Sequence, residues 1–182
     1  MRQVLSLLFT AAALIGQDRP PLEDAIRRAG FTVTPAARAT GSHEVTVNWR
    51  STPSVSTTQG AAAPPTIAVQ AVSAVRHADP PAKQRSAEMS RDHLVALVLD
   101  AQSAVRHWQI IVDPRFTRGE FPGAGGNLNN TSIYREDVTL TVTVPDNVVA
   151  TEVRLLAPSW DAKGVLSLTR VAAIALPAGL LK

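Results

Sequence analysis

The chain has 182 residues, which is enough for one domain with a sizeable core and too few for two domains of ordinary size. Apolar residues make up 45% of it and charged residues 18%, a balance that excludes an intrinsically disordered polymer. The net formal charge of +3 is small and spread along the sequence, which argues against nucleic acid as a partner. The chain contains no cysteine, so disulfides, thiol catalysis and thiolate metal ligands are excluded together.

The first sixteen residues have the pattern of a secretory signal peptide. Arg2 provides a positive start, an uncharged apolar run extends from Val4 to Ile15, and Gly16 offers a small residue where a signal peptidase could cut. A buried helix is the alternative interpretation. The run is too short for a permanent membrane span, and without cysteine there is no lipid anchor. We predict export to the periplasm or the extracellular medium after removal of residues 1–16.

Residues 17–30 predict a short helical lead-in to the main domain. Pro21 suits a first helical turn, and the acidic Glu23 and Asp24 favour the positive end of the helix dipole. Basic residues follow at the other end, and Gly30 supplies a residue that easily adopts the left-handed conformation at a helix stop. The helix is therefore expected between Pro21 and Gly30.

From residue 31 onward the hydrophobic period changes to two, which is typical of strands. Val45, Val47 and Trp49 alternate with polar residues, as in a strand that is buried on one face. Similar patterns predict further strands at 31–34, 66–75, 93–100, 105–113, 138–145, 151–158 and 164–176. Between them we expect a Ser/Thr/Ala/Pro-rich connection at 53–65 and long loops near 77–92 and 113–137.

About eight short strands, one helix and frequent turns predict an all-β, mainly antiparallel, two-sheet sandwich over residues 31–182. The helical crossovers that a parallel sheet needs are missing. In strand number and turn spacing along Phe31 to Leu176, the chain is similar to secreted immunoglobulin-like and fibronectin-type-III-like modules. This resemblance implies a sandwich of two sheets, although the paired cysteines of a true immunoglobulin domain are absent.

The pentapeptide SAVRH occurs twice, at Ser73–His77 and at Ser103–His107. The flanking sequences differ and no third copy stands 30 residues away, whereas stacked-repeat folds need about three units. We interpret the match as a coincidence of composition.

The two copies are also expected to differ in structure. The first ends a strand and enters a loop at His77, whereas the second begins a strand. Strict alternation in the second strand places Arg106 and Trp108 on one face and Val105 and His107 on the other.

The sequence offers little catalytic chemistry. None of the four histidines has the i, i+4 spacing of a helical zinc motif, and no G-x-S-x-G elbow presents a nucleophilic serine. The glycine-rich run from Gly119 to Gly126 lacks the Lys-Ser/Thr pair of a phosphate-binding loop. We predict no catalytic residue, no metal and no cofactor. The alternative is a small secreted hydrolase that uses His93 or His107 with a nearby carboxylate.

The segment 113–137 concentrates residues that binding surfaces use, because aromatic, arginine and asparagine side chains combine contact area with adaptable hydrogen bonds. The candidate binding residues are Arg115, Phe116, Arg118, Glu120, Phe121, Asn127, Asn129, Tyr134 and Arg135. The alternative is that this segment only connects two strands and packs on itself. The leading hypothesis is a secreted, non-catalytic β-sandwich that serves as a binding or structural module. Its partner, a protein or a glycan, is unidentified.

Overall fold

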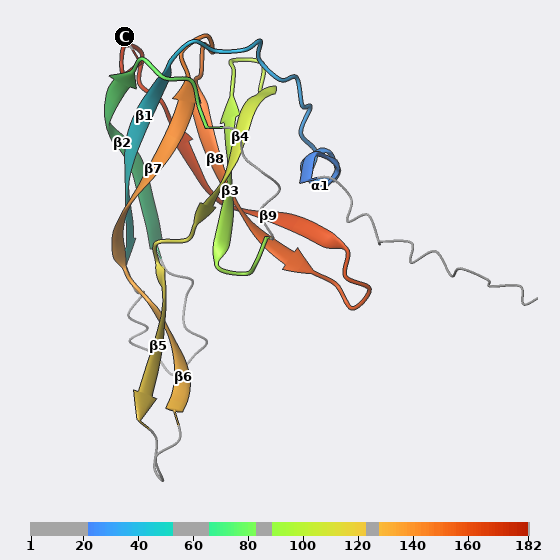
Figure 1. The fold of residues 1–182 in the computed structure, drawn as a ribbon, viewed down its shortest axis with the longest axis vertical. Coiled ribbons are helices and arrows are strands. Elements are labelled where there is room, and N and C mark those ends of the chain that lie inside the picture. The colour runs from blue at the N-terminus through green and yellow to red at the C-terminus, as the bar shows by residue number, and fades with distance from the viewer. Residues whose placement is uncertain (1–21, 53–65, 83–88, 123–127, 182) are drawn as a thin grey trace, which may run out of the picture.

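The computed structural model describes residues 22–52, 66–82, 89–122 and 128–181. One helix and nine strands occupy these ranges, and every strand pair is antiparallel (Figure 1). In chain order they are α1 (Leu22–Arg28), β1 (Ser42–Thr52), β2 (Thr66–His77), β3 (His93–Leu99), β4 (Val105–Val112), β5 (Phe116–Pro122), β6 (Leu128–Tyr134), β7 (Asp137–Pro145), β8 (Glu152–Trp160) and β9 (Leu166–Ala175). The predicted all-β, mainly antiparallel class is confirmed.

Seven of these strands form two sheets that share one apolar core. The strand orders are β2-β1-β7 and β4-β3-β8-β9, while β5 and β6 form a separate two-stranded sheet. Val45 and Val142 of the three-stranded sheet are buried in the same cluster as Leu155 and Ile174 of the four-stranded sheet. The chain therefore has the predicted sandwich-like architecture.

Strand β1 is the centre of the three-stranded sheet, and its sequence shows why. Val45, Val47 and Trp49 are at most 1% exposed, as their alternation predicts. In the register with β7, these residues lie opposite Val142, Leu140 and Val138, so one face of the sheet is continuously apolar.

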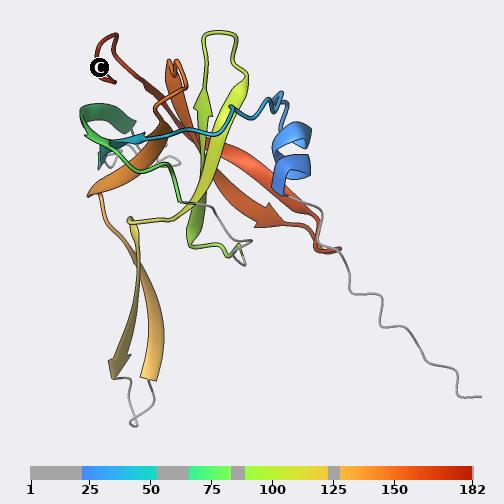
Figure 2. The same cartoon turned by 45° about the horizontal axis from the view of Figure 1, so that its top comes forward.

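Strand β3 is buried on both of its faces. Leu94, Ala96 and Val98 belong to the core between the two sheets, whereas Val95, Leu97 and Leu99 pack on the opposite side with Ile26 of α1. This double burial explains why residues 94–99 form a continuous apolar run instead of an alternating one. Helix α1 is thus a third layer over the four-stranded sheet (Figures 1 and 2).

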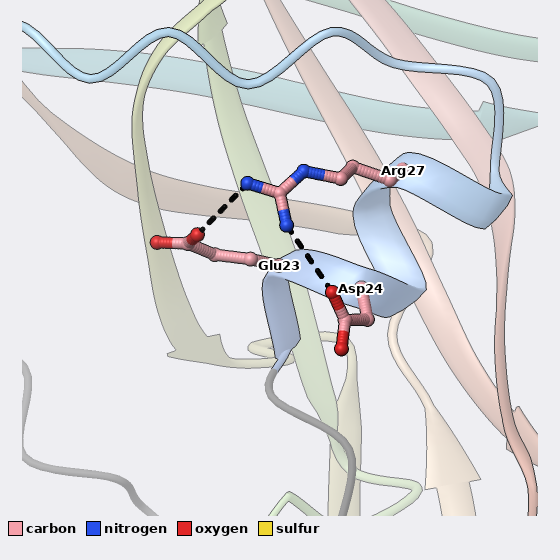
Figure 3. Close-up of polar contacts among 3 residues, drawn as sticks. All are labelled: Glu23, Asp24 and Arg27. Carbon is pink, nitrogen blue, oxygen red and sulfur yellow. Dashed lines mark hydrogen bonds and ion pairs between the residues drawn. The ribbon is translucent and has the colours of Figure 1, made fainter.

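Helix α1 is held by charge pairs and by its C-terminal cap. The guanidinium of Arg27 pairs with Glu23 at 3.4 Å and with Asp24 at 3.2 Å (Figure 3). At the other end, Gly30 has a φ of 90°, its N–H donates to the carbonyl of Arg27, and the N–H of Phe31 donates to that of Ile26. These two bonds form a Schellman motif, and the predicted glycine stop is confirmed.

Two predicted segments differ from the structure. The segment 113–137, which the sequence predicts as a long loop, contains the antiparallel strands β5 and β6. Residues 31–34 form only an isolated parallel bridge, between Val33 and Val105, so they are not a sheet strand of the predicted kind. They still satisfy the open edge of β4, because Thr32 and Thr34 exchange backbone hydrogen bonds of 2.8 and 2.9 Å with Val105.

The two SAVRH copies lie in different sheets, one at the end of β2 and the other at the start of β4. A register shift sets Leu99 opposite Val105 but Val98 opposite His107, which leaves one extra residue in β4. Because of this bulge Val105 packs in the same cluster as Trp108, and the strict alternation predicted for it is wrong.

Several sequence predictions fall on residues outside the described ranges. These are the signal peptide at 1–16, Pro21, and the connection at 53–65. Part of the loop near 77–92 also falls there; the described residues 78–82 and 89–92 contain neither helix nor strand, and His77 is the last residue of β2. Within the described ranges, no helix is both long and apolar enough to cross a membrane.

We predict that Leu97→Ala lowers the free energy of unfolding by about 2–5 kcal/mol, because it leaves a cavity in a strand that is covered on both faces. Leu97 is 0% exposed. Urea unfolding followed by circular dichroism measures the change. The matched control, Val149→Ala, removes a side chain that is 84% exposed and is expected to change stability by no more than about 0.5 kcal/mol. Equal losses in the two variants would contradict the double burial of β3.

Candidate functional site

Strands β5 and β6 form a hairpin that extends away from the two sheets, and we call it the arm (Figures 1 and 2). Its register runs from Phe116 opposite Tyr134 to Pro122 opposite Leu128. Neither strand pairs with a third strand of the described structure, so each has one open edge. The arm connects β4 of one sheet to β7 of the other.

The structure brings most of the predicted binding residues together on this arm. Phe116, Arg118, Glu120 and Phe121 are positions of β5, whereas Asn129 and Tyr134 are positions of β6. Arg115 and Arg135 flank the two strands at the root, and Asn127 lies outside the described residues. The pairing of Arg118 with Ser132 and of Glu120 with Asn130 shows that these positions follow each other along one hairpin.

The root of the arm is fixed by a buried ion pair. Asp113 and Arg115 have side chains only 7% and 16% exposed, and Nη2 of Arg115 lies 2.6 Å from Oδ2 of Asp113. Oδ1 of Asp113 also accepts from the Nε of Arg115 at 2.9 Å and from its backbone N–H at 3.0 Å. The guanidinium lies 4.0 Å from the ring centroid of Trp49, in cation–π geometry.

Arg115 was predicted as a binding residue, but its described contacts are structural. It joins the end of β4 to the core residue Trp49 of β1, and so ties the arm to both sheets. The sequence signal for this role is the acidic residue two positions earlier, Asp113, which a prediction based on loop composition overlooks.

The aromatic pair beside this ion pair closes the arm at its base. The rings of Phe116 and Tyr134 meet edge to face, with centroids 5.4 Å apart and an interplanar angle of 64°. The backbone N–H of Arg135 donates to the carbonyl of Arg115 at 2.8 Å. Tyr134 is nevertheless 64% exposed, so one side of this base faces solvent.

The histidines lie at separate places in the two sheets. His43 of β1 is buried, at 6% exposure. On the solvent side of the same sheet, the Nε2 of His77 lies 3.7 Å from Oε2 of Glu44, and both side chains are about half exposed. His93 and His107 belong to the four-stranded sheet. Among the described residues, no group of three or more histidine and acidic side chains is placed to hold a metal ion.

His93 lies beside Ser90 and Asp92, but the three residues are not arranged as a catalytic triad. In a triad the serine hydroxyl meets Nε2 of the histidine and the carboxylate meets Nδ1. Here Nδ1 of His93 accepts from the backbone N–H of Ser90 at 2.9 Å and lies 2.7 Å from its hydroxyl oxygen. The same hydroxyl donates to Asp92. The contacts describe a local turn before β3, and the hydrolase alternative stays a prediction.

Comparisons with protein-family models, with curated proteins and with solved structures find no significant match to this chain.

We predict that Arg115→Met lowers the free energy of unfolding by about 3 kcal/mol, because it leaves the carboxylate of Asp113 buried without its cation. Arg135→Met is the matched control, since it removes an exposed arginine from the other strand at the root. Chemical denaturation compares the two, and the double variant Asp113→Asn/Arg115→Met is expected to regain part of the loss. Similar stabilities for Arg115→Met and Arg135→Met would rule out the anchoring role.

A second prediction concerns pH. Burial lowers the pKa of His107 from its ordinary value of 6.5. Below about pH 6.5 the unfolded chain therefore binds a proton that the folded chain does not yet bind, so stability is full above this pH and is lost as pH falls through the folded pKa. Denaturant midpoints between pH 7.5 and pH 5 should decline, and His107→Gln should make the decline shallower. A slope that is unchanged in His107→Gln would refute the assignment.

Proposed function

We propose that the protein is a secreted, non-catalytic β-sandwich that acts as a recognition module, with the arm as its contact surface for a protein or glycan. The observation that carries this proposal is the attachment of the arm, which is fixed at its root by Asp113 and Arg115, while no other strand of the described ranges pairs with either of its strands. A lone two-stranded hairpin is marginally stable in water. A partner along the arm would supply the contacts that the protein's own sheets do not.

The composition of the arm favours a protein partner that adds to its edge. Strand β6, Leu128–Tyr134, contains no charged residue, and its outer edge, which no other described strand covers, would offer backbone donors and acceptors. Main-chain hydrogen bonds along such an edge provide affinity in β-strand addition. The aromatic residues at the base, Phe116 and Tyr134, would enlarge the contact, because aromatic side chains are enriched in interfaces.

Export rests on the sequence of residues 1–16, with Arg2, the apolar run and Gly16 as its support. We further propose that the fold is nearest to the immunoglobulin-like and fibronectin-type-III-like sandwiches. Two antiparallel sheets of three and four strands with a common core support this relation. One departure is the order β2-β1-β7: in the immunoglobulin sheet the second strand lies inside its sheet, whereas here the first strand does.

The test is an affinity capture with the full chain, expressed from its own first residue in the source organism and tagged after Lys182. The comparison bait replaces residues 118–132 with a two-residue turn, so that the root residues Arg115, Phe116 and Tyr134 remain. We expect the exported wild type to begin at Gln17 and to retain a partner that the armless bait releases. The partner is then identified by mass spectrometry and its binding is measured with purified components.

Both baits must show the same cooperative melt, since the arm contributes no residue to the described apolar core. A second control bait keeps the arm and carries Arg170→Gln, a change at an exposed position of β9. Equal retention of every partner by the wild-type and armless baits would overturn the proposal, because the arm would then be a connection only.

A further inference from the structure

A concave surface lies beside the start of β4, at the edge of the four-stranded sheet. It is a groove of about 460 Å³, which is within the usual range of small-ligand sites. Valines, alanines and prolines provide most of its lining, and Trp108 contributes the one aromatic side chain. This surface shares none of its lining residues with the arm.

The walls of the groove are held in place by backbone hydrogen bonds. The N–H of Ala36 donates to the carbonyl of Arg106 at 3.0 Å, which continues the bonds that Thr32 and Thr34 make with Val105. At the next residue of the same segment, Nδ2 of Asn147 donates to the carbonyl of Ala37 at 2.8 Å. The groove is therefore formed before any ligand enters it. Because the edge of β4 is already occupied at Val105 and Arg106, a peptide could not add there as another strand.

One cationic side chain that lines the groove has no carboxylate partner among the described residues. Glu23 shares the guanidinium of Arg27 with Asp24 (Figure 3), and Arg106 lies 3.8 Å from Asp100. Arg38 also lines the groove and is exposed, and within the described ranges no acidic side chain pairs with it. An apolar groove with a single uncompensated guanidinium is complementary to a ligand that has an apolar body and one negative charge.

We infer that this groove binds a small amphipathic carboxylate, with the apolar body along Trp108 and the prolines and the carboxylate at Arg38. Guanidinium groups bind carboxylates through paired hydrogen bonds, so Arg38 selects the anion. His107, which also lines the groove, contributes a polar ring to the lining. The inference is independent of the arm, since no residue of β5 or β6 takes part.

The experiment uses isothermal titration calorimetry of the full chain with decanoate, below its micelle concentration. Decanol and decyltrimethylammonium have the same apolar chain with no charge or the opposite charge. We expect decanoate to bind at least ten-fold more tightly than either, and Arg38→Gln to weaken decanoate roughly ten-fold while binding of decanol stays unchanged.

A second variant keeps the inference falsifiable. Ala37→Trp places a large side chain at an exposed lining position and should abolish binding of decanoate, while Arg170→Gln, the matched loss of an exposed arginine outside the groove, should have no effect. Each variant is compared with the wild type only if its thermal unfolding is as cooperative. Binding that is absent, that is equal for decanoate and decanol, or that survives both Arg38→Gln and Ala37→Trp would overturn the inference.

Discussion

The double burial of β3 is the constraint on which the rest of the fold depends. A strand with apolar residues at every position from Leu94 to Leu99 cannot leave either face in water. The three-stranded sheet covers one face, and α1 with the residues that follow it covers the other. The cap at Gly30 turns the chain directly from the helix to the edge of β4, so the same segment that covers the second face also closes a sheet edge.

The arm depends on this frame in a different way, because none of its residues belongs to the apolar core as far as the structure describes it. Its position is set by a polar contact, the pair of Asp113 with Arg115, and by the stacking of that guanidinium on Trp49. Both partners are nearly buried, which makes this contact directional as well as strong. A hairpin that would be marginal alone is thereby presented in one orientation to the surroundings.

Much of the sandwich could be predicted from the sequence, because a strand that is buried on one face has alternating apolar and polar residues. Val45, Val47 and Trp49 are the clearest case, and the stop at Gly30 follows equally from local chemistry. The run at residues 93–99 indicated a buried strand but not that a helix covers its second face, since which element packs there is decided by tertiary contacts.

The differences from prediction have physical reasons as well. The glycines and asparagines of the arm indicate a loop, but β5 and β6 pair as strands. This pairing depends on their register and on the contact of Phe116 with Tyr134, and neither produces a hydrophobic pattern in the sequence. A single extra residue in β4 reversed the face of Val105. The candidate binding residues stay a prediction, whereas the contact of Arg115 with Trp49 required knowing that β1 and the end of β4 meet.

The two ends of the arm are joined by one backbone hydrogen bond of 2.8 Å, from Arg135 to Arg115. For the sandwich, the residues between Arg115 and Arg135 act as a closed loop. The entropic cost of closing a loop grows only slowly with its length. The hairpin can therefore be lengthened, shortened or replaced while β4 keeps its register with β3 and β7 keeps its register with β1. The sandwich and the arm are then free to diversify at different rates.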